Sequence, residues 1–172
     1  MDETLIHCNQ NWTESCDVVL SMKDPTGVSQ KIGINLRPFL HEFLVELKKD
    51  FELILFTASG AIYATTILDY FDPERNLFAK RLFRDSCIKS PEGVFVKDLR
   101  ILGNRSLSDV VLVDNAAHSF ALQIDNGIPI IPFTNNKRDR ELKDLLVYLK
   151  KLRDVKDVRE VNRRTFKLAE MG

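Results

Sequence analysis

The segment "LILFTASGAIYA" (residues 53–64) decides the fold class of this chain. Its first four residues form an unbroken apolar run, which favours a strand buried on both faces of a sheet. Small residues follow, and "GAIYATTILDYF" (60–71) then places apolar side chains at the spacing of a helix. A buried strand that leads directly into a helix is typical of α/β domains. The segment therefore predicts a parallel sheet covered by helices.

The rest of the chain repeats this alternation of apolar strand and helix. "VVLVD" (110–114) and "IPIIPF" (128–133) are further short apolar runs without polar alternation. Helical spacing recurs in "RPFLHEFLVELKKD" (37–50), "DRELKDLLVYLKKL" (139–152) and "VKDVREVNRRTF" (155–166). The expected buried stripes are Leu40, Phe43, Leu44 and Leu47; Ala64, Ile67, Leu68 and Phe71; Leu142, Leu145, Leu146, Leu149 and Leu152; and Val155, Val158 and Val161. We expect one α/β domain over residues 1–172, with a doubly wound parallel sheet.

One stretch departs from this alternation. "CDVVLSMKDPTGVSQKIGINL" (16–36) holds two strand-like runs around the turn signal "KDPTG". It predicts a β-hairpin inserted ahead of the first full helix, and we assign residues 12–36 to it.

Bulk composition limits the class of protein. No apolar run approaches the roughly 18 residues that cross a bilayer, and the first residues lack the pattern of a secretory signal. Three unpatterned cysteines, Cys8, Cys16 and Cys87, favour a reducing compartment, and three scattered histidines do not suggest a zinc site. We therefore expect an intracellular protein, nuclear or cytoplasmic, with no membrane segment.

Charge is distributed unevenly along a chain whose formal net charge is zero. Residues 137–167 carry 12 Lys and Arg against 6 Asp and Glu. Such a segment could meet an acidic partner, but charges that alternate in sign along helices are more typical of a solvated face. We expect no direct contact with nucleic acid.

Polar residues follow the apolar runs in a fixed order. Thr57 follows the first run, Lys97 follows "GVFV" (93–96), and Asp114-Asn115 end the "VVLVD" run. Asp2 stands at the start of the chain. In a doubly wound sheet, ligands bind where the strands end, so we expect these side chains to lie together.

Together, this set of side chains suits a phosphate ester. A hydroxyl beside the free N–H groups of a helix start binds phosphate oxygens, and a lysine neutralises their charge. Oxygen ligands from Asp and Asn suit Mg²⁺, and a carboxylate can transfer protons. Taken singly, each residue has a simpler explanation: a strand end for Thr57, solvated surface for Lys97, a turn for Asp114-Asn115 and a polar terminus for Asp2.

These residues lie within a series of motifs that resembles one known family. The matching segments are "DETLIH" (2–7), "RPFLHEFL" (37–44), "LFTAS" (55–59) with "IYA" (62–64), "RLFRDSC" (81–87) with "VKDL" (96–99), and "VDN" (113–115). They resemble the FCP/SCP-type catalytic domain of C-terminal-domain and nuclear-envelope phosphatases, a branch of the haloacid dehalogenase superfamily. The resemblance implies a haloacid dehalogenase-like fold and a Mg²⁺-dependent protein serine/threonine phosphatase that acts on phosphoproteins or phosphopeptides through an aspartyl-phosphate.

The resemblance also implies a role for each matching residue. Asp2 corresponds to the general acid/base whose backbone also faces the metal, Asn115 to a Mg²⁺ ligand and Asp114 to its supporting acid. The implied phosphate- and substrate-binding residues are Thr57, Ala58, Ser59, Tyr63, Arg84 and Lys97, of which Thr57 and Lys97 are also counted as catalytic. Thr4 is expected to brace the motif loop, and the inserted hairpin to form one wall of the substrate cleft.

One departure from the family pattern concerns the nucleophile. The family attacks with the first aspartate of an Asp-x-Asp motif, and here Met1 takes the middle position. The nucleophile and the central strand before it would fall ahead of Met1. We therefore expect a truncated domain that is inactive as given, with a gap between the strands at 53–57 and 110–114 and Asp2 at the mouth of that gap.

Two other classes of protein remain as alternatives. The first is a catalytically dead domain that binds phosphopeptides or protein partners, which the missing nucleophile favours. The second is a phospho-receiver module, which combines similar residues. A receiver places its phosphorylated aspartate on a middle strand and its lysine on the last strand. In this chain Lys97 precedes Asp114, and the inserted hairpin has no counterpart in receivers.

Overall fold

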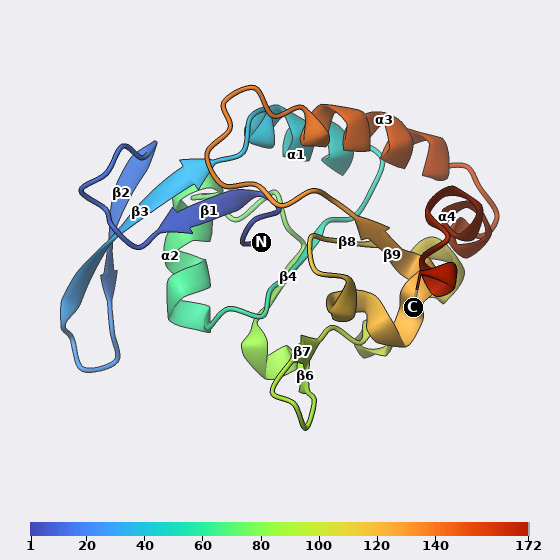
Figure 1. The fold of residues 1–172 in the computed structure, drawn as a ribbon, viewed down its shortest axis with the longest axis horizontal. Helices are drawn as coiled ribbons and strands as arrows, with labels where there is room; N and C mark the ends of the chain where they lie inside the picture. Colours follow the sequence, from blue (N-terminus) through green and yellow to red (C-terminus); the bar gives the residue numbers. More distant parts are fainter. Residues whose placement is uncertain (172) are drawn as a thin grey trace.

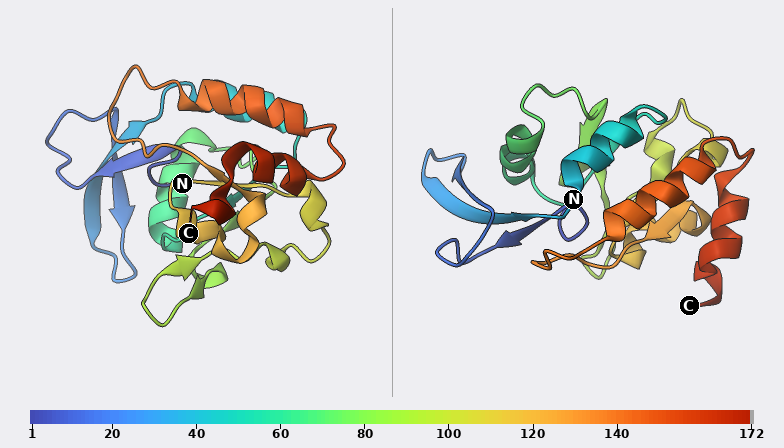
Figure 2. Two further views of the ribbon diagram at one scale, coloured as in Figure 1. Left: turned by 45° about the vertical axis from the view of Figure 1, so that its right-hand side comes forward. Right: turned by 90° about the horizontal axis from the view of Figure 1, so that it is seen from above.

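In the computed structural model, which describes residues 1–171, two pairs of parallel strands lie at the centre of the chain (Figures 1 and 2). Strand β4 (Ile54–Phe56) pairs with β5 (Lys80–Leu82), and β8 (Leu112–Asp114) pairs with β9 (Gly127–Pro129). The predicted strands at 53–57 and 110–114 are confirmed. The third covers only the start of 128–133, because Pro129 and Pro132 have no N–H group to donate to a neighbouring strand.

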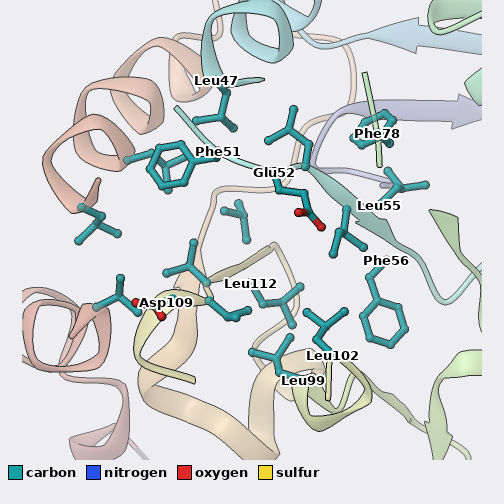
Figure 3. A pocket seen from close by; sticks show the side chains of 18 of the residues that line it. Leu47, Phe51, Glu52, Leu55, Phe56, Phe78, Leu99, Leu102, Asp109 and Leu112 are labelled. Atoms are coloured by element: carbon teal, nitrogen blue, oxygen red, sulfur yellow. The ribbon is translucent and has the colours of Figure 1, made fainter. Parts of the chain in front are cut away.

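A slot separates the two pairs of strands. Within residues 1–171, β4 pairs only with β5 and β8 only with β9, and no backbone hydrogen bond joins 53–57 to 110–114. The slot has a volume of about 540 Å³, and Leu47, Leu55 and Leu112 are among the apolar side chains that line it (Figure 3). The expectation that these two strands are not direct neighbours is confirmed.

Helices α1 (Leu40–Lys48) and α3 (Glu141–Leu152) lie side by side along one side of the molecule (Figure 1). Their apolar stripes face the core as predicted, and Leu146 is only half-buried. The fully buried positions are Leu40, Phe43, Leu44, Leu47, Leu142, Leu145, Leu149 and Leu152. These two helices therefore form an apolar cover over the central strands.

Helices α2 and α4 follow the sequence pattern in part, because Phe71 and Val161 of the predicted stripes are only half-buried. Helix α2 (Ala61–Phe71) buries Ala64, Ile67 and Leu68. Helix α4 (Val158–Phe166) begins at its buried Val158, so Val155 precedes it. Short 3₁₀ helices occupy Arg84–Ser86, Leu99–Ile101, Leu107–Asp109, Ala117–Asn126 and Leu168–Glu170. Helix α4 packs against the 3₁₀ segment Ala117–Asn126 beside β9.

The hairpin region is larger than predicted. Strands β2 (Val18–Lys23) and β3 (Ser29–Leu36) form the expected antiparallel hairpin, but β1 (Ile6–Asn9) adds a third strand in the order β1-β3-β2. The range 12–36 therefore omits one strand of this sheet. The sequence of strand β1 shows no clear apolar alternation. In the structure, only Ile6 of its four residues is fully buried.

The strand before Lys97 also differs from the expectation. Strands β6 (Ile88–Lys89) and β7 (Phe95–Val96) form a separate antiparallel hairpin. Lys97 therefore follows a hairpin strand and not a strand of the parallel pairs. Lys97 is nevertheless buried, and its backbone N–H donates to the carbonyl of Ser119 at 2.8 Å, which ties this segment to the 3₁₀ segment Ala117–Asn126.

Arg37, between β3 and α1, joins distant parts of the chain. Its side chain is buried and donates two hydrogen bonds of 2.9 Å to Asp139. It also donates to the carbonyl oxygens of Thr4 at 3.1 Å and Ile131 at 2.7 Å. A guanidinium can satisfy several acceptors at once because its donors lie in one rigid plane. We call Arg37, Asp139 and these two carbonyls the arginine clamp.

Cys8, Cys16 and Cys87 are all free thiols. Within residues 1–171, every helix is too short or too polar to cross a bilayer.

We expect Arg37→Met to lower the free energy of unfolding by about 3–5 kcal/mol, because it leaves the charge of Asp139 without its buried partner. Urea unfolding at pH 7 measures this loss. The matched control is Lys49→Met, which removes an exposed ion pair with Glu46 and should change stability by less than about 1 kcal/mol. Equal effects of the two substitutions would show that the clamp does not hold the fold together.

Candidate active site

Residues 1–5 form a tight turn between the ends of β4 and β8. The carbonyl of Met1 accepts hydrogen bonds from the N–H groups of Thr4 at 3.2 Å and Leu5 at 2.9 Å. Glu3, between Asp2 and Thr4, has a φ of 58°, in the left-handed region that residues other than glycine seldom adopt. The surrounding contacts hold this conformation, since the N–H of Phe133 donates to the carbonyl of Glu3 at 2.8 Å.

Asp2 turns toward the start of helix α2. Its carboxylate accepts hydrogen bonds from the Ser59 hydroxyl at 2.8 Å and from the Tyr63 hydroxyl at 2.5 Å. Burial and the charge of Asp2 raise the pKa of Tyr63 far above its usual value, so the phenol stays a donor throughout the neutral range. Both oxygens of Asp2 are thus held by residues predicted to bind phosphate or substrate.

The segment after β4 offers donors to an anion. Thr57 is buried, and its hydroxyl oxygen accepts from the N–H of Ser59 at 3.1 Å. Helix α2 begins after Gly60 without a side-chain cap, which leaves backbone N–H groups at its first turn for an external acceptor. Arg84 adds a cation, because its Nε donates to the carbonyl of Ala58 at 2.7 Å. This segment therefore suits a phosphate group.

Lys97 and Asp114 form a buried ion pair at the end of β8. Lys97 Nζ lies 2.5 Å from Asp114 Oδ2, and the other oxygen of Asp114 accepts from the N–H of Ala116 at 2.9 Å. Burial, the largest influence, raises the pKa of Asp114, but the Lys97 charge and these hydrogen bonds hold that pKa below its usual value. Asp114 therefore fixes the position of the lysine ammonium.

The amino group of Met1 lies near the Lys97–Asp114 ion pair. Burial lowers its pKa to about 6, and the charge of Lys97 adds to this effect. The charges of Asp2 and Asp114 act in the opposite direction and raise this pKa.

Asn115 is tied to this turn as well. Its amide oxygen accepts from the Thr4 hydroxyl at 3.1 Å, and its amide nitrogen donates to Glu3 at 3.4 Å. Thr4 thus contacts the residues at the end of β8, while Asp2 contacts those at the end of β4. The bracing role that the resemblance implies for Thr4 stays a prediction, and its hydroxyl joins the turn to Asn115.

A metal ion would rely on few protein oxygens here. Within residues 1–171, no three His, Cys, Asp or Glu side chains gather closely enough to hold a metal. Mg²⁺ commonly keeps several waters and takes only one or two carboxylates. Asp2 and Asn115 supply oxygens of the kind it prefers, so the donor set fits Mg²⁺. Asp114 fits less well as a ligand, because the Lys97 ammonium lies 2.5 Å from one of its oxygens and would repel a metal ion held there.

A groove runs from this site along the hairpin. It has a volume of about 730 Å³ and joins the start of α2 to the turn after β2. Its lining comprises Asp2, Met22, Asp24, Pro25, Ser59, Gly60, Ala61, Ile62, Tyr63 and Arg84. The hairpin thus supplies one wall of a groove that ends at Asp2.

The predicted site residues form two groups joined by the turn at residues 1–5. Asp2, Thr57, Ala58, Ser59, Tyr63 and Arg84 gather at the end of β4, and Lys97, Asp114 and Asn115 gather at the end of β8. Among residues 1–171, no direct hydrogen bond joins Asp2 to Lys97 or Asn115. Sequence reasoning missed Glu3, which contacts Asn115, and Arg37, which holds the carbonyl of Thr4. Glu3 has no signal beyond its place in "DET", and nothing near Arg37 in the sequence identifies its partners.

Comparisons with known proteins agree on one family. The model of the NLI interacting factor-like phosphatase family matches residues 1–159. The "CTD small phosphatase-like protein 3" of Caenorhabditis elegans is 39% identical over 171 residues, which cover 99% of this chain and 58% of that protein. The human "Carboxy-terminal domain RNA polymerase II polypeptide A small phosphatase 1" is 37% identical over 163 residues, or 95% of this chain and 61% of that protein.

A solved structure is similar in fold. The structure of Fcp1, an essential RNA polymerase II CTD phosphatase, superposes with a TM-score of 0.63 at 22% sequence identity. The match covers 90% of this chain and 49% of that one. It supports the haloacid dehalogenase-like α/β fold expected from the motifs. The chain thus spans about half of this structure and less than two thirds of the two relatives.

We expect Asp114→Asn to change how stability depends on pH. Because the folded pKa of Asp114 is depressed, its contribution is present above its unfolded pKa of about 3.9 and is lost as pH falls through the lower folded value. The variant should be less stable at pH 7 and should lose less stability between about pH 4 and pH 2. Urea unfolding across this range, with exposed Glu42→Gln as control, measures the difference. Parallel pH profiles for Asp114→Asn and the parent chain would contradict the assigned ion pair.

Proposed function

Because the chain belongs to the NLI interacting factor-like phosphatase family, we propose that it carries the catalytic framework of a protein serine/threonine phosphatase. One observation supports this most directly. An acid, a phosphate cradle and a buried lysine meet around residues 1–5, and Asp2 in this turn also lines the groove along the hairpin. We propose phosphoserine- or phosphothreonine-containing segments of nuclear or cytoplasmic proteins as substrates.

Each side chain has a definite task in this proposal. The Thr57 hydroxyl and the N–H groups at the start of α2 bind the phosphate oxygens, and the Lys97 ammonium offsets their charge. Asp2, protonated before the bond to phosphorus breaks, gives its proton to the departing serine or threonine oxygen and later takes one from water. Ser59 and Tyr63 hold the Asp2 carboxylate in position until substrate arrives.

Mg²⁺ is the proposed cofactor. When bound, it reduces the repulsion between an attacking carboxylate and the phosphate. The oxygens of Asn115 and Asp2 would hold it, with Asp114 keeping Lys97 beside the site. Asn115 is positioned for this by Thr4, whose hydroxyl donates to its amide oxygen.

Turnover also needs a nucleophile. In the proposed mechanism, a carboxylate attacks phosphorus, the serine or threonine oxygen leaves with the proton from Asp2, and water then hydrolyses the aspartyl-phosphate. Met1 stands where the motif would place a residue between two aspartates, and Asp2 is committed to proton transfer. We therefore propose that residues 1–172 alone bind phosphate but do not hydrolyse phosphate esters.

A phosphopeptide-binding domain is the second candidate. The cradle at Thr57–Gly60 and the Lys97–Asp114 pair support it, because both features are formed without any carboxylate in the attacking position. The two candidates differ in one measurable property, which is the gain of turnover when such a carboxylate is supplied.

We expect residues 1–172 to show no Mg²⁺-dependent hydrolysis of an aryl phosphate. A variant extended ahead of Met1 by five apolar residues and an aspartate should gain activity, because the new carboxylate can attack phosphorus. The matched control carries asparagine in place of that aspartate and should remain inactive. Equal activity of the 172-residue chain and the extended form would show that the nucleophile lies within residues 1–172. Phosphopeptide binding without turnover in the extended form would favour the binding domain.

In the extended form, we expect Lys97→Ala and Asn115→Ala each to lower kcat by about 10²–10³, since each removes a charge or donor that stabilises the reacting phosphate. Asn115→Ala should also raise the Mg²⁺ concentration needed for half-maximal activity, and Lys97→Ala should not. Steady-state kinetics over a Mg²⁺ titration separates the two effects. Changes of only a few-fold in both variants would contradict the assigned roles.

A further inference from the structure

The groove along the hairpin contains a carboxylate that the proposed chemistry does not use. Asp24 lines this groove together with Asp2, Met22, Pro25 and Ile62. We infer that the groove selects substrates that carry a lysine or arginine a few residues away from the phosphoserine or phosphothreonine, with the basic group bound by Asp24. This inference rests on the proposed function and adds to it a preference for the sequence around the phosphate.

Asp24 is held in place by the turn that follows β2. Its Oδ1 accepts hydrogen bonds from the N–H of Thr26 at 2.9 Å, the hydroxyl of Thr26 at 2.6 Å and the N–H of Val28 at 3.0 Å. These bonds from Thr26 and Val28 hold the pKa of Asp24 below its usual value, so the side chain is ionised at pH 7. Within residues 1–171, its Oδ2 accepts no hydrogen bond, which leaves this oxygen to a ligand.

The basic side chains near Asp24 are directed elsewhere. Lys23 does not line the groove, because successive side chains of a strand point to opposite faces. Arg84 does line it, but its Nε donates to the carbonyl of Ala58 at 2.7 Å. Its guanidinium also lies over the ring of Phe95, 5.3 Å from the ring centroid. The charge of Asp24 is therefore not neutralised by the described part of the chain.

Asp2, the other carboxylate of the groove, suits a substrate cation less well. Both of its oxygens accept hydrogen bonds, one from Ser59 and one from Tyr63. In the proposed reaction Asp2 must also carry a proton, and a neighbouring cation would oppose this because it favours the charged form of a carboxylate. A basic residue of the substrate therefore matches Asp24.

The apolar lining of the groove suits the stem of a long basic side chain. Met22, Pro25 and Ile62 line it, and Pro25 and Ile62 are exposed to a ligand. Lysine and arginine place their methylene groups along apolar surface while their charge stays at a polar group. An apolar residue of the substrate would contact this lining but leave Asp24 without a cation, and a glutamate would bring two like charges together.

The size of the groove limits where the basic residue lies. Asp2 and Asp24 line a single groove of about 730 Å³. An extended chain advances about 3.3 Å per residue, so we expect the basic residue within roughly four residues of the phosphorylated one. Asp24 is only partly buried, and ion pairs near the surface are weak, so the expected gain in affinity is about fivefold.

The test uses acetylated and amidated alanine nonapeptides with a central phosphoserine and one lysine, which is moved through the four positions on each side. Isothermal titration calorimetry with the whole chain at low ionic strength measures binding without requiring turnover. Lysine at one position, or at two neighbouring positions, should bind about fivefold more tightly than alanine. Norleucine there should keep only part of this gain, because it has the stem of lysine without its charge. The gain from charge should shrink in about 0.5 M salt.

Asp24→Asn is the matched protein variant. Asparagine can accept the same hydrogen bonds in the turn, so the substitution removes the charge and keeps the hairpin. The preference for lysine over norleucine should disappear, and the alanine phosphopeptide should bind at least as tightly as before. Asp144→Asn is the control, because it removes an exposed carboxylate of α3 that lies outside the groove lining. This control should keep the full preference.

Two results would overturn the inference and leave the proposed function standing. The first is equal binding of the lysine, norleucine and alanine phosphopeptides to the parent chain. The second is a lysine preference of the same size in Asp24→Asn, which would assign the cation to another carboxylate. Failure of every phosphopeptide to bind would instead contradict the proposed phosphate site itself, and this inference with it.

Discussion

The arginine clamp is the constraint on which the site depends. Arg37 is buried, and its guanidinium joins Asp139, ahead of α3, to the carbonyl oxygens of Thr4 and Ile131. It therefore fixes the turn at residues 1–5 against the segment that follows β9. Asp2 and Thr4 lie on that turn and reach the two halves of the site in opposite directions. The Arg37 guanidinium, which has no role in the proposed reaction, thus determines where Asp2 and Thr4 lie.

The site is divided between two strand ends because the sheet is divided. The end of β4 supplies hydroxyls and helix N–H groups, while the end of β8 supplies the lysine, its carboxylate partner and the asparagine. In the described residues 1–171 the two strand ends share no backbone pairing, so helices α1 and α3 and the turn at residues 1–5 bring them together by side-chain packing and hydrogen bonds. This arrangement accounts for the dense bonding around a turn that includes a residue with positive φ.

The sequence predicts the parts of this structure that local pattern controls. Unbroken apolar runs located β4 and β8, and helical spacing located the buried faces of α1, α2 and α3. Strand β1 was missed because its four residues show no clear alternation and their pairing depends on distant residues 33–36. The clamp was missed for a similar reason, since Arg37 and Asp139 are 102 positions apart and the motif that begins with Arg37 does not identify its partner. The site residues were found through their order along the chain, but the Lys97–Asp114 ion pair required coordinates.

The register of the two strand pairs has a consequence for the order in which the chain folds. Ile54 pairs with Lys80 and Leu112 with Gly127, so each pair closes a short loop, whereas the clamp closes a loop across most of the chain. Loop closure costs more entropy as the loop lengthens, and contacts distant in sequence slow folding. We expect each pair of strands to form early and the turn at residues 1–5 to be positioned late. The groups that would handle phosphate then come together only in the final stage of folding.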